Sequence, residues 1–251
     1  MPATAFLLLI EPTPHSGSWN MATDEALLEA ALEWDLTSLR FYRWREPTLS
    51  LGYFQKHQPE QFPEELKPLP RVRRLSGGGA ILHHHEWTYS CTLPPSHPLA
   101  AAPLRLYEVV HQGIVSELKR HQVETALRGN VQDAAEPFLC FGRQDPRDVV
   151  LGKDKIVGSA QRRRRGAILQ HGSLLLERSA FAPAYPGLLN LAPSLADQDG
   201  FIEPLADRLA QSLYPAVLDG VAIRPQDALP EPMVQVATVL DQHKYQTLDW
   251  R

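Results

Sequence analysis

Residues 73–80 read RRLSGGGA. Within this stretch, residues 76–79 separate a short β-like run, residues 71–75, from a longer one, residues 80–93. Three consecutive glycines between strand signals indicate a backbone with unusual torsions or a close approach to a ligand. The free N–H groups of such a loop can hold an anionic or carbonyl-bearing ligand. Because the spacing matches neither the Walker A nor the Rossmann pattern, the run alone is equally consistent with a tight turn.

The sequence before this stretch predicts strands around one helix. Residues 5–10 predict a short buried strand, and apolar side chains recur at helical spacing over residues 20–34, which indicates an amphipathic helix. Two β-rich runs, residues 38–44 and 48–54, flank a Glu-Pro turn and are expected to form adjacent strands. The proline-rich residues 59–70 predict a short helix or an irregular loop.

The sequence after it alternates between helices and strands. Residues 104–121 have helical periodicity, and residues 148–176 predict three strands in meander order with a turn at residues 162–166. Further helical patterns cover residues 201–218 and 232–243. Since no regular βαβ rhythm is present, we expect an α+β fold with a mixed, mostly antiparallel sheet flanked by helices.

Composition limits the class of protein. The 251 residues include 25 Lys plus Arg, 29 Asp plus Glu and 43% hydrophobic residues, for a net charge of −4. These values indicate a globular protein without the dominant basic surface that nucleic acid or anionic lipid requires. The apolar stretch Ala5–Ile10 is too short for a membrane span and follows no basic region. We therefore expect a cytoplasmic protein, and the length allows one large domain or two small ones.

The two cysteines provide neither a disulfide framework nor a four-ligand zinc site. Cys91 lies inside a strand-like run and is interpreted as a core residue. Cys140 ends an apolar run just before the polar residues 142–147. It is equally consistent with a buried structural thiol and with a partly exposed, reactive one.

The tract HHHE at residues 83–86 suggests a metal site only weakly. In a strand, His83 and His85 would share one face while His84 points away, which supplies two ligands and no helical HExxH geometry. We expect no metal. We expect instead that one of these histidines lines a ligand pocket.

Lys155 and a run of four arginines lie in the predicted meander, and each has two interpretations. Lys155 begins a strand with several small residues, where a lysine could polarise a carbonyl group or could simply be a solvated hairpin residue. The four arginines at residues 162–165 form either a solvated turn or a docking point for an acidic partner.

Five blocks occur in one order along most of residues 5–176. They read NMATDEAL, LGYFQ, RRLSGGGA with His83, KIVGSAQ and QHGS, at residues 20–27, 51–55, 73–80, 155–161 and 170–173. This combination resembles the lipoate-protein ligase and octanoyltransferase family, which shares its catalytic fold with biotin-protein ligases. The resemblance implies that residues 1–251 form a single biotin/lipoate protein ligase-like catalytic domain.

Two chemistries occur in that family. Ligases activate a free acid with ATP and magnesium, whereas octanoyltransferases take an acyl thioester from acyl carrier protein and hold it on a cysteine. Cys140 lies upstream of the Lys155 block, where the cysteine-dependent octanoyltransferases keep their nucleophile, and residues 86–90 also resemble that subgroup. The resemblance therefore favours the transferase, with a ligase or a non-catalytic lipoyl-domain-binding protein as alternatives.

The expected reaction moves an octanoyl group from acyl carrier protein to a lysine of a lipoyl carrier domain, of the glycine cleavage H protein or dehydrogenase E2 type. Cys140 would carry the thioester, and Lys155 would favour its thiolate and contact the acyl carbonyl. No cofactor or metal is expected, ATP and magnesium being needed only by a ligase, and neither nucleic acid nor membrane is an expected partner. The residues expected to bind substrate are Arg73, Gly77, Gly78, Gly79, His83, Gly158, Ser159, Ala160, His171 and Gly172.

Overall fold

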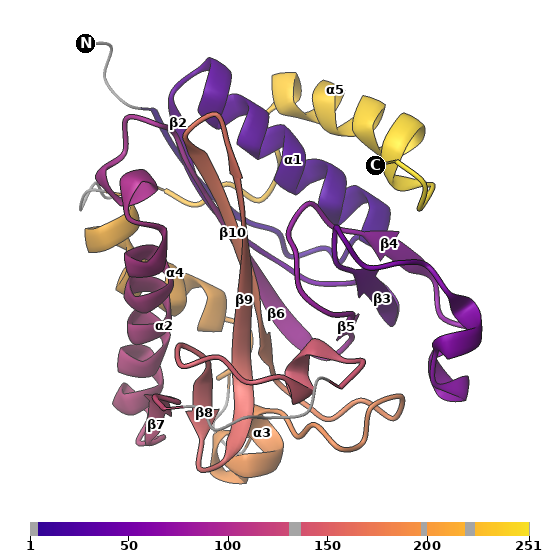
Figure 1. The fold of residues 1–251 in the computed structure, drawn as a ribbon. Helices are drawn as coiled ribbons and strands as arrows, with labels where there is room; N and C mark the ends of the chain where they lie inside the picture. The colour runs from indigo at the N-terminus through magenta and orange to yellow at the C-terminus, as the bar shows by residue number, and fades with distance from the viewer. Residues whose placement is uncertain (1–4, 131–136, 197–199, 219–223, 251) are drawn as a thin grey trace.

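The computed structural model describes residues 5–130, 137–196, 200–218 and 224–250, and its described strands form two sheets (Figure 1). In the large sheet, β1 and β2 are parallel and every other neighbouring pair is antiparallel. Its seven strands, in spatial order, are β1 (Ala5–Ile10), β2 (Leu36–Tyr42), β6 (Glu86–Leu93), β10 (Ala167–Leu175), β9 (Asp154–Arg164), β8 (Val149–Leu151) and β7 (Thr125–Leu127).

The small sheet contains β4 (Arg71–Arg73), β3 (Thr48–Leu51) and β5 (Ile81–His83), in that spatial order. The central strand β3 pairs parallel with β4 and antiparallel with β5. The predicted α+β class, with a mixed and mostly antiparallel sheet flanked by helices, is confirmed.

Two predictions of strand pairing were wrong. The runs at residues 38–44 and 48–54 are not adjacent strands, because β1 and β6 occupy both hydrogen-bonding edges of β2 and leave none for β3. The run at residues 80–93 is not one strand either. It breaks after β5, where the carbonyl of His85 accepts hydrogen bonds from the N–H groups of Leu176 and Glu177, and it resumes as β6 in the large sheet.

The predicted meander at β8, β9 and β10 is confirmed. The turn between β9 and β10 consists of Arg165, with φ of 46°, and Gly166, with φ of 89°. Positive φ at both positions belongs to the two-residue hairpin turn whose twist matches the flanking strands. This hairpin crosses the centre of the molecule and forms one wall of the site (Figure 1).

Helix α1 (Gly17–Glu33) begins at the N-cap Ser16 and lies between the large sheet and α5 (Glu231–Leu240) (Figure 1). The expectation of an amphipathic helix was wrong. Because α1 is covered on two sides, it buries polar residues such as Asn20 and Asp24 as well as its apolar ones. A π-helical turn, Asp241–Tyr245, follows α5 and also packs on α1.

The opposite face of the large sheet is covered by α2 (Pro103–Arg120) and α4 (Leu205–Val217), which bury their apolar side chains against it (Figure 1). A short helix, α3 (Leu188–Leu191), follows β10, and the proline-rich residues 59–70 form two single 3₁₀ turns. None of the helices in the described part of the chain combines the length and apolar character needed to span a membrane.

Candidate active site

A glycine loop, residues 76–79, connects β4 to β5 and packs against the backbone of another glycine. A Cβ atom at Gly52 would lie 2.0 Å from the carbonyl oxygen of Gly78, so no other residue fits there. Gly78 itself has a φ of 93°, in the left-handed region that favours glycine. Gly52 and Gly78 are therefore required by the shape of this contact.

Arg74 holds the glycine loop from inside the protein. Its guanidinium donates to the carbonyl oxygens of Gly77 and Gly79, both at 2.7 Å, and of Ser50 at 2.8 Å. Burial lowers the pKa of Arg74 to about 10, and a thiolate at Cys140 would act in the opposite direction. Arg74 is still protonated near neutral pH, so a fixed positive charge lies against the glycine loop.

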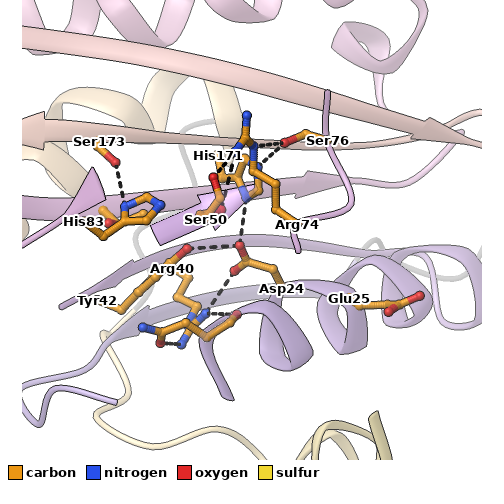
Figure 2. A network of polar contacts seen from close by, with 12 residues as sticks. Asp24, Glu25, Arg40, Tyr42, Ser50, Arg74, Ser76, His83, His171 and Ser173 are labelled. Atoms are coloured by element: carbon orange, nitrogen blue, oxygen red, sulfur yellow. Dashed lines mark hydrogen bonds and ion pairs between the residues drawn. The ribbon is translucent and has the colours of Figure 1, made fainter. Parts of the chain in front are cut away.

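The first residue of the loop is held by a buried relay (Figure 2). His171 contacts the Ser76 hydroxyl through Nε2, and its Nδ1 is 3.0 Å from Asp24 Oδ2. Burial by itself raises the pKa of Asp24, but the hydrogen bond from His171 and the charge of Arg40, at 2.9 Å, together lower it. Because an ionised carboxylate only accepts hydrogen bonds, Nδ1 of His171 is the donor. The relay thus fixes the loop to α1 and β2.

Cys140 begins a 3₁₀ turn, Cys140–Gly142, and is half-buried. Its backbone N–H donates to the carbonyl of Ala80 at 2.7 Å, which ties the turn to the end of the glycine loop. A Cβ atom at Gly78 would lie 3.9 Å from the Cys140 sulfur and 3.1 Å from Nη2 of Arg74. The thiol therefore faces the glycine loop close to the guanidinium of Arg74, and a neighbouring cation favours a thiolate.

Lys155 lies on β9 next to this turn, with a buried side chain. Its ammonium is 2.9 Å from Oδ1 of Asp148 and 3.4 Å from the carbonyl oxygens of both Cys140 and Arg143. Burial raises the pKa of Asp148, and the charge of Lys155 only partly offsets that effect. The ammonium is thus fixed beside the backbone that carries the cysteine.

A cavity of about 300 Å³ opens between the glycine loop, the Cys140 turn, β9 and α2. It brings together seven of the residues that sequence analysis assigned to the site, namely Gly77, Gly78, Cys140, Lys155, Gly158, Ser159 and Ala160. Ile81, Tyr107, Phe141 and Gln161 complete the lining. The cavity combines a thiol, an ammonium group and apolar walls, which is a suitable environment for an activated acyl group.

A second, narrower pocket lies between α1 and the two sheets. It contains His83, His171 and Gly172 from the predicted set, together with apolar groups such as Met21. Ile81 lines both the cavity and this pocket, so the two lie on either side of one side chain.

The sequence pattern of the lipoyl protein ligase A/B catalytic domain family matches residues 16–191, a range that includes the lining of the cavity and of the narrower pocket. The chain belongs to this family. The match contains the glycine loop, the cysteine, the lysine and the relay histidine.

Relatives of the family are more than one third identical to the chain over the matched residues. It is 37% identical over 171 residues to the octanoyltransferase LipM of Oceanobacillus iheyensis, covering 66% of this chain and 63% of that protein. It is 38% identical over 172 residues to LipM of Carboxydothermus hydrogenoformans, covering 67% and 64%. The matches thus span less than two thirds of these relatives.

Solved structures of the family share the fold. A lipoate-protein ligase A bound with ATP has a TM-score of 0.72 and 22% identity, with 98% of this chain and 97% of that chain covered. A bipartite lipoate protein ligase from Thermoplasma acidophilum, described with its E2 lipoyl domain, has a TM-score of 0.69 and 23% identity, with 98% and 94% covered.

Arg73 and Gly79, both assigned to substrate binding, are absent from the lining of the cavity and of the narrower pocket. The buried Arg73 guanidinium donates to the carbonyls of Gly52 at 2.9 Å, Gln55 at 2.6 Å and Leu248 at 2.9 Å, and so it supports the loop that faces Gly78. Gly79 is covered by the side chain of Arg143, since a Cβ atom there would lie 2.8 Å from its Nε.

The predicted alternation along the histidine tract was wrong, because β5 ends at His83. That ring stacks on Trp44 at 3.8 Å and its Nδ1 lies 2.7 Å from Oε1 of Glu86. His84 and His85 stack on each other at 3.5 Å within the turn that follows. Across the described residues, no three His, Cys, Asp or Glu side chains are grouped so that they could hold a metal ion.

Two residues that contact the site in this structure were missed by sequence analysis. Arg74 directly follows Arg73, and only the position at the end of β4 decides which guanidinium reaches the glycine loop. Asp148 comes just before β8, and its pairing with Lys155 depends on the register between β8 and β9. The sequence contained a signal for Arg74 alone. Successive side chains of a strand point to opposite faces, so Arg73 and Arg74 could not both be expected to face the glycine loop.

Proposed function

We propose that the chain is an octanoyltransferase of protein lipoylation, which moves an octanoyl group from acyl carrier protein to a lysine of a lipoyl carrier domain. The observation that carries this proposal is the Cys140 thiol in a cavity that also contains the buried ammonium of Lys155. The names of the relatives in Oceanobacillus and Carboxydothermus support it. We place the reaction in the cytoplasm, where both protein substrates would be found.

In the first step, the Cys140 thiolate attacks the thioester carbonyl of octanoyl carrier protein. A new C–S bond forms to Cys140, the C–S bond to the carrier breaks, and the carrier thiolate leaves and takes up a proton. Arg74 favours the attacking thiolate, and Lys155 stabilises the oxyanion of the tetrahedral intermediate. The cavity of about 300 Å³ that contains Cys140 and Lys155 receives the acyl chain.

In the second step, the lysine amine of the lipoyl domain attacks the acyl-Cys140 thioester. The C–N bond of the amide forms, the C–S bond breaks, and the proton lost by the amine balances the one taken up by the Cys140 sulfur. Exchange between two thioesters is nearly balanced in free energy and an amide is more stable than a thioester. The transfer is therefore downhill without a nucleotide.

Mass spectrometry of the intact protein tests this function. The protein mixed with octanoyl carrier protein, without ATP, should gain one octanoyl mass that hydroxylamine removes, and should lose it when a lipoyl domain is added. A lipoate ligase, which the shared fold also allows, would instead attach free octanoate or lipoate only with ATP and magnesium. A lipoyl-domain-binding protein without catalytic activity would bind the domain and transfer nothing.

The four arginines were not all in a turn as predicted, because Arg162–Arg164 end strand β9 and only Arg165 lies in the β9–β10 turn. They are expected to contribute unequally to docking of the acidic carrier protein. Arg162 lies 4.6 Å from the centre of the Tyr53 ring, and Arg164 pairs with Glu29, which leaves Arg163 and Arg165 exposed. Exposed charges at the rim of an interface act mainly on the association rate and its salt dependence.

Replacing Arg163 and Arg165 with serine should therefore raise the KM for octanoyl carrier protein and flatten its response to salt, with kcat nearly unchanged. Steady-state kinetics between low and high salt measure this effect. A double variant with the salt response of the unaltered protein would show that the turn is merely solvated.

A further inference from the structure

A buried histidine of α2 is joined to the cavity through Ser159. His111 is 1% exposed, its Nδ1 contacts the carbonyl oxygen of Arg147, and its Nε2 is 2.6 Å from Oγ of Ser159. Neither step of the proposed reaction requires a histidine at this position. Ser159 lines the cavity together with Cys140.

The direction of these hydrogen bonds follows from their partners. A carbonyl oxygen only accepts, so Nδ1 of His111 carries a proton. Burial lowers the pKa of His111 to about 4, so near neutral pH the ring is uncharged and Nε2 has no proton. The Ser159 hydroxyl must therefore donate its hydrogen to Nε2.

A second hydroxyl completes the environment of Ser159. The Tyr89 oxygen is 2.6 Å from Ser159 Oγ, and Gln170 donates to Tyr89 at 2.8 Å. Because the Ser159 hydrogen is already used, Tyr89 is the donor in their contact. The two hydroxyls meet across Gly172, where a Cβ atom would lie 2.2 Å from the Ser159 oxygen.

Ser159 thus has one donated hydrogen, one accepted hydrogen and one remaining lone pair, so it can only accept a hydrogen bond from a substrate. An oxyanion needs donors, which excludes Ser159 from stabilising the tetrahedral intermediates. Of the reacting groups in the proposed reaction, only the attacking amine brings N–H donors into the cavity.

We propose that Ser159 accepts a hydrogen bond from the amine of the acceptor lysine, and that His111 is the positioning residue that keeps Ser159 in its accepting orientation. The proposal rests on the proposed function and deepens it. One N–H held by Ser159 turns the nitrogen lone pair toward the thioester carbon as the C–N bond forms and the C–S bond to Cys140 breaks. Formation of acyl-Cys140 involves no amine and does not depend on this contact.

The test separates the two steps in a His111→Leu variant by rapid quenching and intact mass. We expect transfer from acyl-Cys140 to the lipoyl domain to slow about tenfold, as for loss of one hydrogen bond, while acylation by octanoyl carrier protein keeps its rate. His111→Gln should restore transfer, because its amide can donate to Arg147 and accept from Ser159. His121→Leu, at the end of the same helix, is the matched control and should leave both rates unchanged.

Ser159→Ala provides a second test that does not depend on the folding of the His111 variants. It should slow the transfer step as His111→Leu does, and the double variant should be no slower than either single one. Equal slowing of both steps, or additive effects, would overturn the role of His111 and Ser159. If the unaltered protein forms no acyl-Cys140, it is the proposed function that fails.

Discussion

Cys140→Ala is expected to abolish octanoyl transfer, because the variant has no nucleophile to conserve the energy of the donor thioester. It should gain no octanoyl mass from octanoyl carrier protein and should produce no octanoylated lipoyl domain, with or without ATP. Because the Cys140 side chain is only half-buried, its truncation to alanine should leave the fold intact. Thermal denaturation checks this point.

Cys91→Ala is the matched control for Cys140→Ala. Cys91 is fully buried in the core, and burial raises the pKa of its thiol, so it is neither accessible nor ionised near neutral pH. This variant should still form the acyl-enzyme and transfer the group. Retained activity in Cys140→Ala, with attachment of free octanoate that depends on ATP and magnesium, would contradict the transferase and favour a ligase.

Lys155→Met should reduce the rate of acyl transfer about 100-fold or more, as for the loss of one oxyanion donor, while octanoyl carrier protein still binds. Methionine preserves most of the apolar stem that packs in the cavity. Lys155→Arg should restore little, because a planar guanidinium cannot replace a compact ammonium held between the carbonyls of Cys140 and Arg143. Single-turnover kinetics measure the effect.

A change at Lys155 also removes the nearer of the two cations at the buried carboxylate of Asp148 and leaves only Arg128, at 3.8 Å, so stability should fall independently of catalysis. The double variant Lys155→Met/Asp148→Asn removes that carboxylate charge. It should regain the thermal stability of the unaltered protein and remain as slow as Lys155→Met. Recovery of activity together with stability would show that Lys155 acts on the fold and not on the reaction.

Local sequence signals predicted the hairpin at the centre of the site. The β9–β10 turn has its glycine where φ is positive, and the strands on both sides alternate as a meander requires. The glycine loop was also predicted from local sequence, since three successive glycines indicate a backbone with unusual torsions or a close approach to a ligand. The hairpin and the glycine loop depend on residues close together in the chain, so the local sequence is sufficient to predict them.

Features that depend on partners far away in the sequence were not predictable. Nothing in residues 38–54 indicates that β1 and β6 already occupy the edges of β2. The pairing of Lys155 with Asp148, and of His171 with Asp24, requires the strands and α1 to be in place. The family resemblance supplied most of the site residues, but it could not separate Arg73, which supports a loop, from Arg74, which holds the glycine loop.

The bond from Arg73 to the carbonyl of Leu248 joins positions 175 residues apart. The same guanidinium supports the Gly52 backbone on which the glycine loop rests. During synthesis on the ribosome, this support can therefore form only after Leu248, 175 residues beyond Arg73, has emerged and folded back. Contacts that close such long segments form slowly, so we expect the candidate active site to be completed late in folding.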